Sequence, residues 1–530
     1  MLKRIATTAL LAVLAGGLLT SCGGSKSKPT TPTGSLTTLV SDLPGVCDAV
    51  SFPFNVTDIS LTGASVNGQT IGGTTPINAS SPSEPEIRIN LGCLRDFTTV
   101  LNVNTANAGT YYYAQLWLSE PQMTFYDPTI LPPSPPINTA VLTMSPLKFT
   151  LIPISPPLVV DSGHASVLHL DFDMLHMIQS ITKDPKTGLL DVTATPEFTF
   201  TPVTASGSQG EGFGEVDDLV GFVRSVTTVP PGYNGLYNGS FSLQLLSNSI
   251  SDAPNIPINI SSSTSLYGFS QLNQLVTDSF MEVDAYIDVD GNFVATSVED
   301  EYTECLPSSP PLPPCYDQTI LAIIGPVTSL TRDSQGNVTS FNLWARDVEP
   351  NDAAVVTLDS IPEVNVSTAT IYQYSSRNVN FANLPFGPAN ITVGQELIVH
   401  GVVKPPTFTS APGAPPIPSL VDAAKVYVKL QSIQGSFGSL VQVGDDDKTG
   451  AFTLTPCPIM FQGTPAMVLT NNQTVYVNLV GLSSLSGLPS QPTLIVKGLP
   501  FYEGQAQTIN GVPVPAGTLV ILAKQVHQLQ

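Results

Sequence analysis

Three short stretches decide the fold of this chain, because each one opens a copy of the same series of strand-like sequences. They read GFVRSV at 221–226, GPVTSL at 325–330 and GSFGSL at 435–440. Each begins with glycine, has an apolar residue two positions later, and ends in serine followed by an apolar residue. A motif that recurs at long, similar intervals is typical of repeated domains. The second half of the chain is therefore predicted to contain three related units.

Four further elements follow each opening stretch in the same order: a Phe-x-Leu pair, an apolar–Tyr pair, an apolar run and an Ala-x-x-Val pair. They are Phe241 and Leu243, Leu266-Tyr267, 281–285 and Ala295 with Val298 in the first unit; Phe341 and Leu343, Ile371-Tyr372, 397–401 and Ala423 with Val426 in the second; Phe452 and Leu454, Val475-Tyr476, 494–498 and Ala523 with Val526 in the third. Five short strands per unit predict a small closed barrel, because closure removes the exposed edges of a sheet. The alternating Phe, Leu and Val positions are expected to fill its interior.

The region before these units also has the pattern of β-strands. Residues 35–40, 86–91, 110–118 and 166–172 alternate or run apolar, with many β-branched and aromatic side chains. The chain contains 48 prolines and 41 glycines, which interrupt helices, and only 174–180 has the pattern of a short helical turn. We therefore expect a mainly β protein: an N-terminal β-sandwich followed by three small five-stranded OB-like β-barrels.

Composition marks the boundaries between these domains. A Ser- and Gly-rich stretch, ASGSQG at 205–210, indicates a linker after the sandwich. The predicted order is a sandwich at 35–203, a linker at 204–218, a first barrel at 219–302, a Pro-rich loop at 303–320, a second barrel at 321–431 with a Pro-rich insert at 404–419 between its fourth and fifth strands, and a third barrel at 432–530.

The start of the chain has the pattern of an export signal. A basic pair at 3–4 precedes an apolar run at 5–18, which is too short to span a membrane well. The next four residues, LTSC at 19–22, resemble the lipobox of bacterial lipoproteins. This resemblance implies that residues 1–21 are a signal peptide and that Cys22 becomes the lipidated first residue of the mature protein.

A lipid on Cys22 would anchor the protein to a membrane of the cell envelope, outside the cytoplasm. The polar residues over 22–34 predict a flexible tether between this anchor and the sandwich. Gly23, which follows the lipidated cysteine, lacks the acidic retention signal known in some Gram-negative bacteria. We therefore expect the outer membrane if the organism has one.

The charge of the chain argues against one class of partner. The formal net charge is −22, and only 11% of the residues are charged. An acidic surface repels phosphate backbones, so nucleic acid is not expected as a partner. The same surface gives no attraction to anionic lipid headgroups, so the lipid must do the anchoring.

The five cysteines besides Cys22 fit an oxidising compartment. Cys47 and Cys93 lie in the first domain and could pair, as could Cys305 and Cys315, which flank a Pro-rich loop. Each disulfide would contribute roughly 3–4 kcal/mol in the loop-entropy model. Cys457 is left over, and a buried small apolar residue is favoured there over a reactive thiol. No Cys-x-x-Cys occurs, so a zinc site is not supported.

The first domain contains SLTTLVSDLP at 35–44, NVTDI at 55–59, AGTY at 108–111 and LHLDFD at 168–173. These motifs resemble domain-of-unknown-function family 4382 of bacterial envelope lipoproteins. The three later units, with their Gly-x-Val opening and Val-x-Gly fourth strand, resemble domain-of-unknown-function family 5666. The resemblances imply an envelope protein, and neither family carries a catalytic motif that could be transferred to this chain.

The densest set of ligand-type side chains is His169, Asp171, Asp173 and His176. Side chains alternate along a strand, so the first three would share one face and could hold a metal or an acid–base pair. The alternative is favoured: this is the solvent face of a strand whose Leu168, Leu170 and Phe172 point inward. His164 and His400 stand alone and are expected at the surface or in hydrogen bonds.

The best aromatic cluster is Tyr111 and Tyr113 with Trp117, which would share one side of a strand with Gln115 between them. Exposed aromatic rings at this spacing would make a platform for sugar rings or for a partner protein. The alternative, which is favoured, places these rings in the sandwich core and Tyr112, with the three apolar residues that follow it at alternate positions, on the other side.

Two acidic turns resemble cation sites only superficially. DVDGN at 288–292 has its glycine at the wrong position for an EF-hand loop, so a hairpin turn explains it better. GDDDKTG at 444–450 fits a solvated turn. No nucleophile elbow, His-Glu-x-x-His, phosphate-binding loop or dinucleotide fingerprint occurs.

These observations favour a non-enzymatic binding or scaffold protein without cofactor or metal, whose partner is a glycan or another envelope protein. One alternative is a glycan-active hydrolase that uses carboxylates near Asp171 and Asp173, because such a pair leaves no spacing signature. Another is a structural spacer, in which the barrels hold the sandwich away from the membrane.

Overall fold

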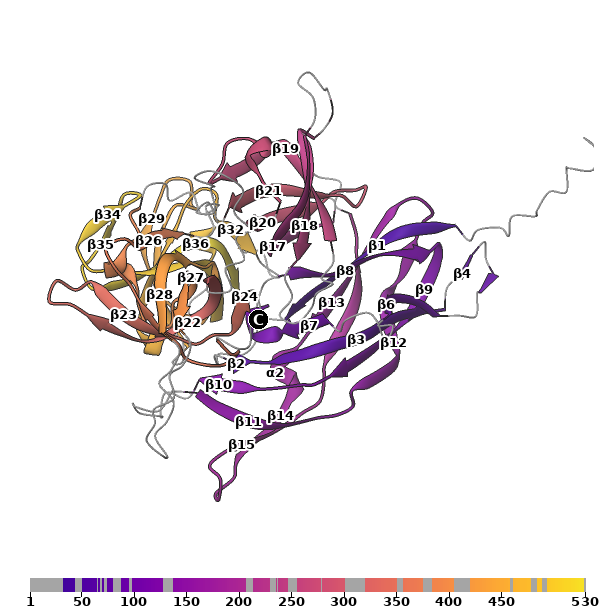
Figure 1. The fold of residues 1–530 in the computed structure, drawn as a ribbon, viewed down its shortest axis with the longest axis horizontal. Helices are drawn as coiled ribbons and strands as arrows, with labels where there is room; N and C mark the ends of the chain where they lie inside the picture. The colour runs from indigo at the N-terminus through magenta and orange to yellow at the C-terminus, as the bar shows by residue number, and fades with distance from the viewer. Residues whose placement is uncertain are drawn as a thin grey trace, which may run out of the picture.

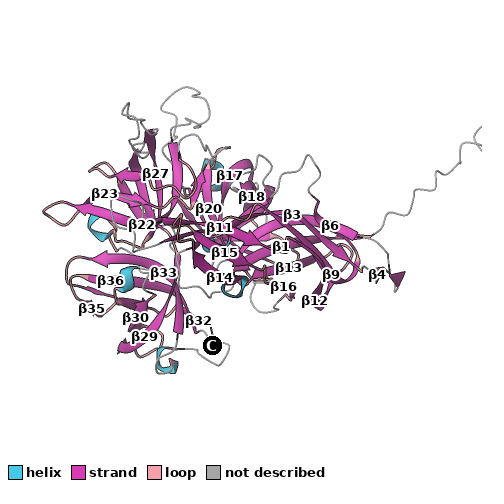
Figure 2. Ribbon diagram, turned by 90° about the horizontal axis from the view of Figure 1, so that it is seen from below, coloured by secondary structure: helices cyan, strands magenta, loops and turns pink. Residues whose placement is uncertain are grey.

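A computed structural model shows a mainly β protein, as the sequence predicted (Figures 1 and 2). It describes residues 32–42, 50–63, 65–66, 69–70, 74–79, 87–94, 98–126, 137–205, 213–228, 235, 237–245, 255–277, 279–300, 320–349, 356–374, 384–404, 420–457, 461–477, 484–488 and 493–528. Within these ranges, no helix is long and apolar enough to cross a membrane.

The N-terminal domain is built from two sheets. The larger has the order β6 (Thr74–Ala79), β3 (Pro53–Thr62), β9 (Gly109–Ser119), β12 (Lys148–Val160), β16 (Phe198–Val203), β13 (Ala165–Phe172), β1 (Thr33–Asp42) and β8 (Thr98–Asn107), with β7 (Ile87–Asn90) paired to β3. The smaller has the order β14 (Ile178–Lys183), β15 (Leu190–Ala194), β11 (Ile137–Met144), β10 (Thr124–Tyr126) and β2 (Val50–Ser51). Short elements complete the domain: η1 (Leu91–Cys93), α2 (Met174–Met177), and the pair β4 (Ser65–Val66) and β5 (Gln69–Thr70).

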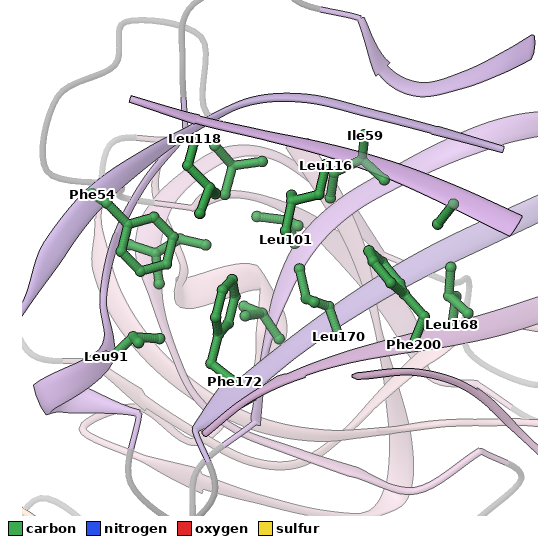
Figure 3. Close-up of a cluster of buried hydrophobic side chains, with 14 of the residues drawn as sticks. Phe54, Ile59, Leu91, Leu101, Leu116, Leu118, Leu168, Leu170, Phe172 and Phe200 are labelled. Carbon is green, nitrogen blue, oxygen red and sulfur yellow. The ribbon is translucent and has the colours of Figure 1, made fainter. Parts of the chain in front are cut away.

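The two sheets enclose one apolar core (Figure 3). Leu168, Leu170 and Phe172 of β13 are fully buried in it, as the alternation along this strand predicted. Met144 and Val192 contribute from the smaller sheet. The predicted helical turn at 174–180 is shorter than expected, because β14 begins at Ile178 and pairs with β15.

Three five-stranded barrels follow, and each closes in the order first, second, third, fifth and fourth strand. The first consists of β17 (Glu215–Thr228), β18 (Gly239–Leu245), β19 (Asn255–Tyr267), β20 (Phe280–Ile287) and β21 (Phe293–Asp300), with η2 (Leu272–Gln274). The second consists of β22 (Ile320–Arg332), β23 (Val338–Leu343), β25 (Glu363–Asn365) with β26 (Ile371–Tyr374), β27 (Glu396–Lys404) and β28 (Leu420–Val428), with β24 (Asp347–Glu349) and η4 (Pro388–Asn390).

The third barrel consists of β29 (Gln431–Val443), β30 (Gly450–Pro456), β31 (Ala466–Thr470) with β32 (Val475–Val477), β33 (Thr493–Glu503) and β36 (Thr518–Gln528). It also carries η5 (Phe461–Gly463), η6 (Leu485–Gly487) and the hairpin of β34 (Gln507–Ile509) and β35 (Val512–Val514). The five repeated sequence elements lie on corresponding strands of all three barrels, so the repeat and the barrel class are confirmed.

The structure explains the glycine that opens each repeat. A Cβ atom on Gly325 would lie 1.7 Å from the Trp344 carbonyl oxygen. The equivalent distance is 2.3 Å for Gly221 and 2.5 Å for Gly435, again to a carbonyl oxygen of the neighbouring chain segment. Glycine is needed here because two backbone segments approach too closely for any side chain.

The first barrel begins earlier than expected. Strand β17 starts at Glu215, and Val216 is fully buried, whereas the sequence places a linker up to residue 218. Val216 belongs to an apolar cluster that also contains Leu39 and Val167 of the sandwich. The residues before the opening glycine therefore attach the barrel to the larger sheet.

The four domains pack into one assembly rather than a string (Figures 1 and 2). The β20–β21 turn meets the sandwich so closely that a Cβ on Gly291 would lie 2.2 Å from the Ala165 Cβ. The second and third barrels share an apolar cluster to which β33 contributes Phe501. Buried residues of the first and second barrels, such as Phe280 and Ile398, form a further cluster.

The cysteine assignments change at one position. Cys457, directly after β30, is buried and disulfide-bonded. It is therefore not a leftover thiol, although it is buried as expected. The side chains of Cys47, Cys93, Cys305 and Cys315 lie outside the described residues, so neither predicted pair is tested. The bond at Cys457 means that these two pairs do not account for every disulfide of the chain. The signal peptide, Cys22 and most of the tether also lie outside the described residues.

His400 lies inside the interface between the first two barrels. Of the two positions expected from the sequence, the surface position is therefore wrong. Its ring centroid lies 5.7 Å from that of Phe280 and 5.4 Å from that of Tyr427. Burial, together with the charge of Lys425, lowers the pKa of His400 to about 3. The folded protein therefore keeps this ring neutral at ordinary pH.

This low pKa predicts acid sensitivity. An unfolded histidine has a pKa near ~6.5, so below that pH the unfolded chain binds the proton more tightly. Stability from this group is complete above about pH 6.5 and falls by about 1.4 kcal/mol per pH unit below it. His400→Phe should flatten the decline in melting temperature between neutral and acidic pH. His164→Phe, at an exposed sandwich position, is the control; equal slopes in all three proteins would contradict the prediction.

Candidate functional site

The outer face of the larger sheet carries two of the three predicted aromatic residues. On β9, Tyr113 is exposed and Trp117 is half-buried, on the side away from the core. Tyr111 points into the core, is fully buried, and donates a hydrogen bond to the Asn107 carbonyl oxygen at 2.7 Å. The expectation that Tyr111 shares a face with Tyr113 and Trp117 is therefore wrong. The favoured alternative, with all three rings in the core, is wrong too, because Ala114, Leu116 and Leu118 fill the core instead.

The alternation fails because the strand pairing is irregular at this point. Tyr113 lies opposite Pro153 of β12, whereas Tyr111 lies opposite Leu158, so four residues of β12 stand against Tyr112 alone. As a result Tyr112 and Tyr113 are both exposed, by 47% and 43%. Bulges of this kind redirect side chains and occur often beside functional sites.

A second bulge in β12 adds an apolar side chain to this face. Leu151 stands in the two-residue bulge opposite Gln115, has a φ of +59° and is 62% exposed. The left-handed backbone region is costly for leucine, and strained residues of this kind cluster at functional sites. Two neighbours supply polar groups: Lys148 Nζ lies 4.4 Å from the centroid of the Trp117 ring, and Gln115 Oε1 accepts a hydrogen bond from Ser60 Oγ at 3.2 Å.

We call Tyr112, Tyr113, Trp117, Lys148 and Leu151 the outer aromatic face. Aromatic rings bury large areas at little entropic cost, and amide and ammonium groups can fix a polar ligand beside them. Sequence alone misses Tyr112, Lys148 and Leu151, because nothing in the chain tells which strand pairs with β9. The proline-rich sequence of β12 is the one signal of its irregularity.

His169 and Asp171 are joined by a serine instead of by a metal-type cluster of ligands. Because β1 and β13 are parallel neighbours, Ser41 lies opposite Asp171. Ser41 Oγ donates to Asp171 Oδ1 at 2.5 Å and lies 2.9 Å from His169 Nε2. Burial lowers the pKa of His169 and raises the pKa of Asp171. In a catalytic triad the carboxylate binds the histidine, whereas here it binds the serine.

Asp173 and His176 are engaged elsewhere. Asp173 caps α2, where its Oδ1 accepts the His176 backbone N–H at 3.1 Å and its Oδ2 lies 2.5 Å from His176 Nδ1. This hydrogen bond to Asp173 raises the pKa of His176. The four residues therefore do not converge, and no set of three His, Cys, Asp or Glu side chains suited to a metal occurs among the described residues.

The two acidic turns are held by their own backbone. Asp288 Oδ1 accepts the N–H groups of Asp290 and Asn292, and Gly291 has a φ of +83°, as a hairpin turn requires. Asp446 accepts the N–H groups of Lys448 and Thr449. Both match the turns that the sequence predicted.

Comparison with known proteins supports one of the two family resemblances seen in the sequence, in the first barrel. The model of the Domain of unknown function (DUF5666) matches residues 240–299, which run from the second to the fifth strand of the first barrel. No curated protein matches the chain. A solved structure titled "drosophila Unr CSD456" is similar with 9% sequence identity over 59% of this chain and 97% of that chain, but its TM-score of 0.13 is too low to carry an argument.

Proposed function

We propose that this chain is a lipid-anchored envelope protein that binds a glycan, without catalysis, through the outer aromatic face. The observation that carries the proposal is the joint exposure of Tyr112, Tyr113 and Leu151 beside Trp117 on a rigid sheet. A well-packed sheet holds such side chains in place without a ligand, so little ordering is required when the ligand binds.

A glycan fits this face better than a purely apolar partner surface does. Sugar rings have apolar faces that stack on aromatic rings and hydroxyl groups that need hydrogen bonds. Tyr113 and Trp117 are four residues apart on β9, which corresponds to about 13 Å along a strand. Gln115 and Lys148 lie close to this line and can hydrogen-bond hydroxyl groups. An envelope protein is the second candidate partner, since the exposed leucine and tyrosines would suit it.

The geometry gives less support to the two alternatives. A hydrolase would need a free pair of carboxyl groups, but Asp173 caps α2 and Asp171 is bound by Ser41. A spacer would need barrels arranged in a line, but the three barrels are grouped against each other and the sandwich (Figure 1).

The binding face is tested with the chain from Gly23 onward on immobilised envelope glycans. The double variant Tyr113→Ala/Trp117→Ala should weaken retention about tenfold or more, because two stacking contacts are lost. Ile181→Ala, on the exposed strand β14 of the smaller sheet, should bind like the wild type. Retention of an envelope protein but of no glycan would favour the second partner. Undiminished binding by the folded double variant would sink the proposal.

The anchor is tested by replacing Cys22 in the full-length chain. Cys22→Ser should move the protein from the membrane fraction to the soluble fraction, because the thiol that would carry the lipid is lost. Thr20→Ser, which leaves the cysteine in place, should remain with the membrane. Metabolic labelling with a fatty acid should mark the control and not Cys22→Ser. Membrane association of Cys22→Ser at the wild-type level would contradict lipid anchoring.

A further inference from the structure

The third barrel exposes an apolar strand segment that its own fold does not use. At the end of β29, Leu440, Val441 and Val443 are 42%, 45% and 43% exposed. Large apolar side chains at three of four successive positions form a patch rather than the scattered exposure that is normal on a protein surface. The segment lies where β29 has two bulges against β30, between Phe437 and Leu440 and between Leu440 and Gln442.

The sister barrels show that this exposure is not a requirement of the fold. Leu440 lies opposite Phe452, and the equivalent residues Val226 and Leu330 lie opposite Phe241 and Phe341. Val226 and Leu330 pack against the cores of their barrels. The residues that follow them, Thr227-Thr228 and Thr331-Arg332, are polar. Among the residues that the structure describes, this barrel alone of the three turns large apolar side chains outward at the end of its first strand.

One edge of the segment has no strand partner among the described residues, and the nearest recorded contact there is a hydrogen bond of 3.5 Å from Gln442 Nε2 to the Gly511 carbonyl oxygen of the β34–β35 turn. Strand β33 pairs with β29 from Gln431 to Ser436 and no further. From Phe437 onward, β29 has a described strand partner only in β30. An edge of this kind can accept an extended segment of another protein, which gains main-chain hydrogen bonds and buries alternate side chains.

The chain beyond this strand is acidic. Asp445, Asp446 and Asp447 follow Val443 after one glycine, with a single cation, Lys448, next to them. Hydrogen bonds to Thr449 and to Ser486 lower the pKa of Asp446 and of Asp447, respectively. Asp446 and Asp447 hold the turn, whereas Asp445 is exposed. The end of the patch is therefore negatively charged at neutral pH.

We propose that the exposed end of β29 docks an extended segment of a partner protein, with apolar side chains against Leu440, Val441 and Val443 and a lysine or arginine beside Asp445. Charge complementarity selects this occupant. A second copy of this chain would bring another acidic turn and a net charge of −22 to the contact, which opposes self-association. The contact is independent of the outer aromatic face, which lies on the sandwich.

The test uses labelled synthetic peptides and the chain from Gly23 onward. One peptide alternates valine and threonine and ends in three lysines; a second ends in three glutamates instead. Fluorescence anisotropy should show saturable binding of the lysine peptide, weakened by salt, and at least about tenfold weaker binding of the glutamate peptide. The variant Leu440→Thr/Val441→Thr/Val443→Thr, which copies the polar sister strands, should lose about tenfold or more in affinity.

Two further variants keep the test decisive. Asp445→Asn removes one negative charge and leaves the hydrogen bonds of Asp446 and Asp447 in place, so it should lower the affinity for the lysine peptide. This variant tests the charge contact even if the triple variant folds poorly. Val402→Thr, at an exposed position of β27, is the matched control and should bind normally. Equal binding of both peptides, no saturable binding of either, or full binding by the folded triple variant would overturn the proposal. So would sedimentation showing that the patch instead joins two copies of the chain.

Discussion

Replacing Arg346 with alanine should lower the free energy of unfolding by about 3–5 kcal/mol, because it leaves a buried carboxylate without its partner. Arg346 Nη2 lies 2.6 Å from Glu396 Oε1, and the two side chains are only 4% and 9% exposed. Arg346 Nη1 also donates to the Gly92 carbonyl oxygen at 3.1 Å. One guanidinium thus joins the second barrel to the sandwich.

Urea unfolding at neutral pH measures this effect, followed by circular dichroism and tryptophan fluorescence. Arg346→Ala should unfold at lower urea, with the second barrel separating from the sandwich in an earlier transition. Arg346→Met/Glu396→Leu should recover much of the loss, because no charge remains buried. Lys524→Met, which breaks the more exposed ion pair with Glu215, should change stability by less than about 1 kcal/mol. An Arg346→Ala protein as stable as Lys524→Met would show that the buried pair does not hold the domains.

Adding one methyl group at Gly325 should destabilise the second barrel by about 3 kcal/mol or more, the upper part of the range for overpacking. The new Cβ would lie 1.7 Å from the Trp344 carbonyl oxygen, and backbone cannot move aside as a flexible side chain can. The Trp344 indole N–H bonds Asp359 Oδ1 at 2.9 Å, and Asp359 Oδ2 accepts Thr124 Oγ1 of the sandwich at 3.0 Å. Displacing Trp344 should therefore also loosen this contact between domains.

Thermal melts of Gly325→Ala and Gly387→Ala form a matched pair within one barrel. Gly387 has an extended backbone, and the nearest atom to a Cβ placed there is Asn390 Oδ1 at 4.0 Å, so alanine should be tolerated. Gly221→Ala and Gly435→Ala should be destabilising too, at the corresponding positions of the other barrels. If Gly325→Ala melts like Gly387→Ala, close backbone packing is not the reason for the repeated glycine.

The barrels could be predicted from sequence because their information is local and repeated three times. Phe241, Phe341 and Phe452 are buried at equivalent positions, each two residues before a buried leucine on a short strand. One weak pattern would not define a barrel, but the same five patterns in one order do. The glycine that opens each repeat also has a local cause, the close approach of the following strand.

The candidate sites could be predicted only in part. Strict alternation put Tyr111 on one face with Tyr113 and Trp117, but a bulge opposite Tyr112 turns Tyr111 into the core and leaves Tyr112 and Tyr113 exposed. Likewise, the sequence grouped His169 and Asp171 with Asp173. Ser41, which is distant in sequence, is the residue that joins His169 and Asp171, because β1 pairs with β13.

By itself, the sequence determined the β class, the three barrels with five strands each, and the turns at Asp288 and Asp446. These follow from side-chain alternation, from turn residues and from contacts between neighbours in the chain. Only the tertiary structure decided three features: the burial of His400 and Arg346, the set of residues that share the outer aromatic face with Tyr113, and the exposed end of β29. Those depend on which strands and domains meet across hundreds of residues, and no local pattern encodes the free energy of such distant contacts.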